Sequence, residues 1–484
     1  MLHWASSSMK RRMPWLASLL VCGFLVLAFL LIDSHSASAL PTPSIKVNAL
    51  PAFARKYGMP CSSCHEAWPK LSPFGQAFKD NGYQMGNDRD APIFQQPAYW
   101  PVTWRITPQW HRDSLGRVGV DGPGVSPVEA RVTTHGFDWS GLDFHTAGTL
   151  AKNVSFYVLP ASDNTGAFHF EAVWARFDNL LGSSWLNIKV GKFELDNLQS
   201  EKRILTLSTF GGSYQNYHFQ PATENPSGVA VPFTFGIGDN QVGVEWMGHS
   251  KNDRTRISAS LLSSNDGNPG LPTSRGYDGF ISASQAFEAG SLGVQRVGVF
   301  GYFGQAPTYF QYNQTVGGTT TGVAGTGIGN KSFYRVGFIG MWYLKKLDFT
   351  TMYFRGWDNA FLGTGTAANA ALPTGARAPT WNGGLIETHY NLNPQLILIN
   401  RLETVRMSQQ ALPVDPAGAP GTVPSSNFGD IDVVTTGFRY YPFISSRAGF
   451  AFHNEFSIFR QRGASPTGLD QTNSSLLFGF DFAF

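Results

Sequence analysis

The chain has 484 residues and a formal net charge of +3; charged residues make up 14% of it, aromatic residues another 14%, and 53 residues are glycine. So small a net charge gives no electrostatic reason to expect nucleic-acid binding. Only three cysteines are present, which excludes a fold held by several disulfides, and the scarcity of charge is unusual for a soluble enzyme.

The N-terminal segment, residues 1–39, is predicted to be an export signal. Basic residues at 10–12 precede an uncharged run over 13–32, and Ala37 and Ala39 form an A-x-A cleavage pattern. The uncharged run is long enough to span a bilayer, so a retained anchor helix is the alternative. Cleavage after Ala39 would leave two cysteines in the mature chain.

Residues 40–98 are predicted to form a small helical module. The stretch 51–58 is one candidate helix. A second candidate follows Ser72, which is placed to cap it, with Pro73 at the first helical position and Gly82 at the end. A module of this size rarely packs a stable core unaided, so a bound cofactor would supply the missing part.

The C-x-x-C-H motif at residues 61–65 predicts covalent attachment of one haem c. Cys61 and Cys64, one helical turn apart, would form thioethers with the two vinyl groups, and His65 would be the proximal ligand of the iron. A thioredoxin-like disulfide and half of a zinc site are the rival interpretations. The first lacks a βαβ context, and the second lacks two further ligands.

The sixth ligand of the haem iron is left open by the sequence. Met85 is the candidate within the module, because it follows the attachment motif at a distance and a thioether would raise the potential. A packed methionine without a ligand role is the alternative explanation. Met59 is too close in sequence to reach the far face of the haem. His111 and His135, from the region that follows the module, and an open or water-bound position are further alternatives.

Residues 99–484 alternate between large apolar residues and small or polar ones with a period of two, which predicts β-strands. The alternation is clear in the stretches 185–192, 241–248, 255–262 and 449–459. The C-terminal stretch 474–484 puts four phenylalanines on one face and Asp481 on the other. A strand between lipid and a polar lumen explains this arrangement better than a strand of a soluble sandwich.

The sheet must close, because an exposed sheet edge is prohibitive in lipid. Spanning strands have roughly 9 to 11 residues, with short turns at one end and long loops at the other, so the length of this region predicts about 16 antiparallel strands. The prediction is therefore an all-β transmembrane barrel whose lumen is plugged by the N-terminal helical module.

Three predicted loops carry almost no charge. They are residues 306–330, with no charged residue, 364–380, with only Arg377, and 408–429, with only Asp415. An acidic exterior is one explanation, because carboxylates would be protonated there and would add little. Simple drift of low-complexity loops is the other.

The stretch MPCSSCHEAWPKLSPFGQAFKDNGY at residues 59–83, followed by a porin-like chain, resembles the outer-membrane fused cytochrome-porin family, best known as iron(II) oxidases of iron-oxidising bacteria. The likeness covers the whole mature chain in architecture, and its specific motif content lies in residues 51–83. The family's haem cysteines and histidine correspond to Cys61, Cys64 and His65. The low charge is similar to that of family members from acidophiles.

These features predict an outer-membrane c-type cytochrome that acts as a one-electron oxidoreductase. One haem inside the barrel would divide roughly 25 Å of hydrocarbon into two shorter steps. The resemblance implies extracellular Fe(II) as the electron donor, and a periplasmic cytochrome c or blue-copper protein is the expected acceptor. The alternatives are a diffusion porin with an appended periplasmic haem module and a peroxidase-like haem enzyme, which would need an open sixth position and a distal acid-base pair.

Overall fold

The computed structural model divides the chain into two compact units, residues 1–46 and 47–484, and every described residue belongs to the second. The predicted export signal and the predicted module boundary at 98 lie outside the described residues. The structure describes residues 53, 57, 59–67, 70–83, 85, 102–120, 128–162, 165–195, 223–224, 230–231, 237, 240–263, 277–306, 311–324, 331–358, 378, 380–408, 430–444, 449–462 and 469–483.

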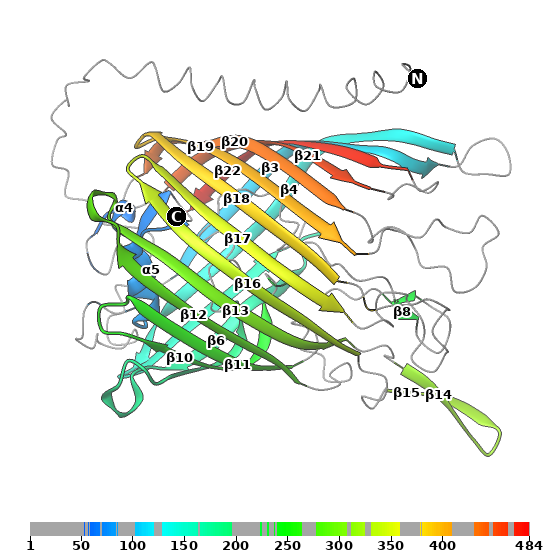
Figure 1. The fold of residues 1–484 in the computed structure, drawn as a ribbon, viewed down its shortest axis with the longest axis horizontal. Coiled ribbons are helices and arrows are strands. Elements are labelled where there is room, and N and C mark those ends of the chain that lie inside the picture. Colours follow the sequence, from blue (N-terminus) through cyan, green and yellow to red (C-terminus); the bar gives the residue numbers. More distant parts are fainter. Residues whose placement is uncertain are drawn as a thin grey trace, which may run out of the picture. The chain divides into compact units, whose positions relative to one another are not determined.

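Sixteen of the described strands close into one antiparallel barrel, which confirms the predicted fold class and strand number (Figure 1). Strand β22 pairs with β3, and β7 pairs with β10 across the longest connection. The strands are β3 (Val102–Val120), β4 (Val128–Ala151), β5 (Val154–Ser162), β6 (Phe168–Phe177), β7 (Asn187–Phe193), β10 (Gln241–His249), β11 (Thr255–Ser263), β12 (Tyr277–Glu288), β13 (Val294–Ala306), β16 (Lys331–Leu344), β17 (Leu347–Asp358), β18 (Thr380–Asn393), β19 (Leu396–Met407), β20 (Ile431–Ile444), β21 (Gly449–Gln461) and β22 (Gln471–Ala483).

The two ends of the barrel differ in the length of their connections. Residues 152–153 join β4 to β5 and residues 345–346 join β16 to β17, and such short turns gather at the left of Figure 1. Residues 264–276 join β11 to β12 and residues 359–379 join β17 to β18 at the other end. Outer-membrane barrels have short turns on the periplasmic side and long loops outside. We name these the short-turn end and the long-loop end.

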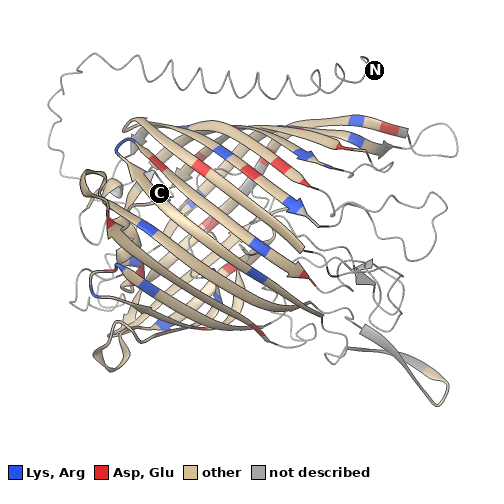
Figure 2. Cartoon of the chain, in the orientation of Figure 1, with Lys and Arg blue, Asp and Glu red and all other residues tan. Residues whose placement is uncertain are grey.

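The outer face of the barrel is apolar. On β22, Phe478 is 50% exposed, whereas its neighbour Leu477 and the carboxylate of Asp481 are buried. The same alternation holds on β7, β10, β11 and β21, so the faces assigned from the sequence are confirmed. Charged residues are sparse along the strands (Figure 2). An apolar band of this kind is what a lipid-facing strand requires.

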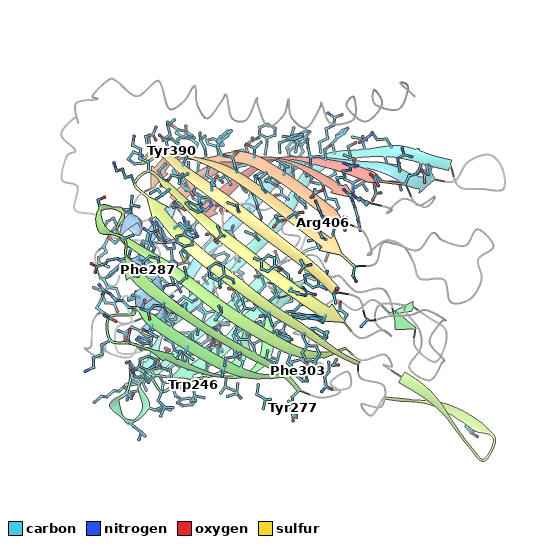
Figure 3. All side chains as sticks on the ribbon, viewed as in Figure 1. Trp246, Tyr277, Phe287, Phe303, Tyr390 and Arg406 are labelled. Atoms are coloured by element: carbon cyan, nitrogen blue, oxygen red, sulfur yellow. The ribbon has the colours of Figure 1, made fainter. Side chains whose placement is uncertain are left out.

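Aromatic side chains mark both rims of the outer face. Tyr277 begins β12 at the long-loop end, and Phe303 lies near the same end of β13. Phe287 lies at the opposite end of β12, and Trp246 lies toward the short-turn end of β10 (Figure 3). Aromatic girdles at both interfaces are characteristic of transmembrane barrels.

The inner face carries buried ion pairs. Arg105 Nε lies 2.9 Å from Asp481 Oδ1, and Arg105 Nη1 lies 3.0 Å from Asp143 Oδ2. Arg439 also pairs with Asp481, at 3.3 Å. These residues come from four strands, β3, β4, β20 and β22, on both sides of the seam that closes the barrel. Buried charges of this kind are tolerated because they are paired.

The inner face also carries buried aromatic residues on five consecutive strands. They are Phe280, Phe300, Tyr302, Phe333, Phe354 and Trp381. Glycines on neighbouring strands make room for the rings: a Cβ on Gly337 would collide with the ring of Phe300, and one on Gly356 with the ring of Trp381. All six belong to one hydrophobic cluster that reaches Phe78 and Tyr83 of the N-terminal module. The inner wall is therefore apolar and buried along this side.

The described part of the N-terminal module contains two helices and a small antiparallel pair of strands. They are α4 (Cys61–Cys64), β1 (His65–Ala67), β2 (Lys70–Leu71) and α5 (Pro73–Asp80). Helix α5 begins as predicted: Ser72 Oγ accepts a hydrogen bond from the amide of Gly75 at 3.1 Å, and proline occupies the first helical position. Gly82, just past the helix end, has φ 74. Of the other predicted helix only Phe53 and Tyr57 are described, and both are helical.

The remaining described elements are short. They are η3 (Leu180–Gly182), η5 (Gly290–Leu292), the strand pair β8 (Thr223–Glu224) and β9 (Ala230–Val231), and the strand pair β14 (Gln311–Val316) and β15 (Thr319–Ala324). Among the residues described, none of the helices has the length and apolar character needed to cross a bilayer.

Candidate functional site

The C-x-x-C-H motif forms a tight turn held by backbone hydrogen bonds. Helix α4 spans Cys61 to Cys64, and His65 opens β1 immediately after it. The amide of Ser72 donates to the carbonyl of Cys64 at 2.8 Å, and Ser72 Oγ donates to the carbonyl of Ser63 at 3.0 Å. We name residues 61–65 the attachment turn. Ser72, which caps α5, therefore also holds the attachment turn in place.

Helix α5 packs directly on the attachment turn, and this contact depends on glycine. A Cβ on Gly75 would overlap the carbonyl oxygen of Cys64, so any larger residue would force the two helices apart. Phe74, the neighbour of Gly75, is 43% exposed, whereas Phe78 one turn later is 7% exposed. An exposed aromatic ring on the helix that packs on the attachment turn is the kind of surface that a flat apolar group would cover.

The thiol of Cys64 is not activated for disulfide exchange. Its thiol is free and half-buried, and burial raises the pKa of the thiol. Redox-active cysteines instead need a lowered pKa, because the thiolate is the reactive form. A cysteine pair spaced by one turn, with His65 next in the chain, is the donor set for haem c. The residues present therefore fit that cofactor.

Four aromatic rings form the core of the module. Phe53 stacks on Tyr83 with ring centroids 5.1 Å apart, and it meets Phe78 edge-on at the same distance. Tyr57 packs on Phe78 and donates its hydroxyl to the carbonyl of Tyr83 at 3.2 Å. Tyr83 also stacks on Trp174 of the barrel wall, 6.3 Å away. The module's core is thus continuous with the wall.

The three sequence candidates for the sixth ligand lie in different environments. Met85 is partly buried and packs against the hydrophobic cluster that contains Phe78 and Tyr83. His111 faces the lumen from β3, with ring nitrogens 3.8 Å from Asp113 and 3.9 Å from Asp138.

The third candidate, His135, lies on the outer face of the barrel. It is exposed on β4, two residues from Phe137, which is 92% exposed, so both lie on the outer face. A side chain on the outer face cannot reach a group held in the lumen. The structure therefore removes His135 from the alternatives.

Lys70 of the module enters a buried cluster of charges on the barrel wall. Its ammonium contacts Asp348 Oδ1 and lies 3.0 Å from His389 Nδ1. His389 Nε2 lies 2.7 Å from Glu387 Oε1, and Arg401 bridges Glu387 and Glu403. We name Asp348, Glu387, His389, Arg401 and Glu403, on β17 to β19, the anionic socket.

The C-terminal end of α5 enters a second cluster, built around two arginines of the barrel wall that also pair with Asp178 and Asp253. Arg176 Nη2 donates to the carbonyls of Lys79 and Asp80, each at 3.1 Å, while its Nε bonds Asp178 at 2.6 Å. Arg256 Nη2 forms an ion pair with Asp80 Oδ2 at 2.9 Å. We name Arg176 and Arg256, on β6 and β11, the arginine socket.

Neither socket was found from the sequence. Lys70 and Asp348 are 278 residues apart, and no local pattern links them. The available signal was the charged residues on the inward phase of otherwise apolar strands, such as Glu387 and Arg401. That pattern indicates a polar lumen, but it does not reveal which partner fills it.

No protein-family model and no curated protein matches the chain. Solved outer-membrane proteins are similar to it. The OmpTdeltaL8 mutant of Vibrio cholerae OmpT is 13% identical over 79% of this chain and 99% of its own, with a TM-score of 0.42. DcaP of Acinetobacter baumannii is 10% identical over 78% and 96%, with a TM-score of 0.45, and OprB of Pseudomonas putida is 9% identical over 79% and 94%, with a TM-score of 0.42. By its own closed sheet, unequal ends and apolar outer face, this chain is an outer-membrane-type β-barrel protein.

Proposed function

We propose that this protein is an outer-membrane c-type cytochrome that takes electrons from extracellular Fe(II) and passes them to a periplasmic cytochrome c or blue-copper protein. The observation that carries the proposal is the contact between the module bearing the attachment turn and the inner wall, through Lys70 and Asp80. A module that only hung in the periplasm would have no reason to bury charged side chains among inward-facing residues of the barrel.

The chain's own residues have distinct roles in this proposal. Cys61 and Cys64 hold haem c, which when bound supplies a one-electron redox centre, and His65 ligates its iron. Met85 is the proposed sixth ligand. The aromatic core around Phe78 would give the haem an apolar neighbour within the module. An apolar shell of this kind raises the reduction potential.

The apolar inner wall on β12, β13 and β16 to β18 favours this function over a diffusion porin. Large porins keep a water-filled channel, whereas the inner wall here carries six buried aromatic residues in one cluster with the module. Electron transfer needs no open path for solutes. The described residues of the inner wall therefore fit a barrel that encloses a redox module.

The test is the visible spectrum of the protein purified from membranes of a host that matures c-type cytochromes. We expect a low-spin ferric spectrum, and we expect stoichiometric Fe(II) at acid pH to convert it to the ferrous spectrum without oxygen. The variant His65→Ala should lose this spectrum, and His135→Ala, on the outer face, should keep it. A water-soluble product, or a membrane protein with no haem, would overturn the proposal. A high-spin haem that reacts with peroxide would indicate the peroxidase alternative.

A further inference from the structure

We propose that Lys70 and Asp80 are positioning residues that lock the module into the two sockets of the barrel wall. This makes the redox centre a stationary relay in the lumen and not a tethered shuttle. The inference rests on the proposed function for the identity of that centre. The locking itself is argued from contacts within the chain.

Lys70 brings its ammonium into the anionic socket. Asp348, Glu387 and Glu403 provide three carboxylates, and Arg401 and His389 provide at most two positive charges. All five side chains are nearly or wholly buried. Removing one partner of a buried ion pair is strongly destabilising, so the contact of the Lys70 ammonium with Asp348 holds the module against the wall.

The arginine socket complements the other end of the same segment. The C-terminal end of a helix carries partial negative charge on its unpaired carbonyl groups. Arg176 donates to two of these carbonyls, and Arg256 pairs with the side chain of Asp80. The stacking of Tyr83 on Trp174, two residues before Arg176, adds an apolar contact beside this pair.

The two sockets contact the module from well-separated parts of the barrel wall. In the order of strands around the ring, β12, β13 and β16 separate β11 from β17, and β20 to β22 with β3 to β5 separate β19 from β6. Two attachments on well-separated walls prevent hinge motion about either one. Between them run β2 and α5, and α5 packs directly on the attachment turn at Gly75. The position of His65 is thereby fixed relative to the wall.

The experiment measures hydrogen exchange of the α5 amides in the oxidised full-length protein in detergent or lipid, without Fe(II). An isolated eight-residue helix is marginal in water, so protection of α5 reports its docking. We expect strong protection in the unmodified protein. Breaking a buried ion pair with Lys70→Met or Asp80→Asn should speed α5 exchange by about 100-fold or more, while exchange of the barrel strands stays unchanged.

Controls separate positioning from general loss of structure. Lys70→Arg keeps the positive charge and should restore most of the protection. Lys152 and Asp470 are exposed residues of the barrel. The control variants Lys152→Met and Asp470→Asn remove the same side-chain types there and should leave α5 exchange unchanged. Rapid α5 exchange in the unmodified protein, or no change in Lys70→Met and Asp80→Asn, would overturn the inference. Failure of Fe(II) to reduce the haem while α5 remains protected would overturn the proposed function alone.

Discussion

At the scale of single residues, Met85 has two proposed roles, apolar packing and iron ligation, and substitution by leucine affects them differently. Its side chain already contributes to the hydrophobic cluster of the module. Leucine preserves apolar volume, so Met85→Leu should cost less than about 1.5 kcal/mol of stability. We expect this variant to lower the haem potential and shift the visible spectrum, because leucine cannot ligate iron. Redox titration measures the change, and an unaltered spectrum with an unaltered potential would assign Met85 to packing alone.

Gly75 tests the contact between α5 and the attachment turn. In Gly75→Ala the added methyl would overlap the carbonyl oxygen of Cys64, so α5 must move away from the turn. We expect reduced haem incorporation per folded barrel, measured as haem absorbance relative to protein. Gly279→Ala is the matched control, since a Cβ there meets no atom within 4 Å. Equal haem content in the two variants would contradict the expected role of Gly75.

At the scale of elements, the docking of α5 should resist acid. Burial raises the pKa of the Asp80 carboxyl, but positively charged neighbours hold this pKa below the ordinary value of 3.8. These neighbours, the strongest first, are Arg256, Lys79, His249 and Arg176. The ionised Asp80 carboxylate therefore stabilises the docked state fully at pH values above its ordinary pKa. This stabilisation is lost as the pH falls below the ordinary pKa and through the lowered pKa.

Protection of α5 against exchange, corrected for the intrinsic pH dependence, should therefore stay constant down to about pH 3.8 and decline below it. Asp80→Asn should make this decline smaller, because it removes the contribution of the Asp80 carboxyl. A loss of protection well above that pH, in a protein whose barrel remains folded, would contradict the assigned role of the carboxyl.

Strand β22 tests the assignment of the outer face. Phe478 is half-exposed near the middle of the strand and faces outward. A lysine at the bilayer midplane costs about 2 to 4 kcal/mol in barrels of this kind. We expect Phe478→Lys to lower the free energy of unfolding from lipid vesicles by that amount, and Phe478→Leu to change it far less. Similar stabilities for the two variants would mean that this face does not meet lipid.

At the scale of the whole molecule, the barrel should be closed to ions. The inward aromatic residues and the module occupy one continuous cluster, and ion pairs line the wall around it. We expect the purified protein in planar bilayers to lack the steady conductance of an open pore of this strand number. A large, steady conductance in the unmodified protein would favour the diffusion porin, whatever the spectrum of its haem.

Much of the architecture could be predicted, because its signals are local in the chain. The alternation of Phe478 and Phe480 with Asp481 predicted the lipid and lumen faces of β22, and the capping pattern at Ser72 predicted the start of α5. Strand number followed from length and the thickness of a bilayer. The burial of individual side chains on α5 was less predictable. Phe74 and Phe78 are one turn apart, yet only Phe78 is buried, because the rings of the module core pack on it.

The sequence by itself carries the proposed attachment chemistry, since Cys61, Cys64 and His65 lie within five consecutive residues and each residue type has a specific role in that proposal. It also predicted the barrel, because the period-two alternation occurs within each strand and can be recognised locally. Only the tertiary structure decided where the module docks. Lys70 contacts Asp348 because the module packs against the inner face of β17, 278 residues later in the chain, and no local sequence pattern predicts that contact.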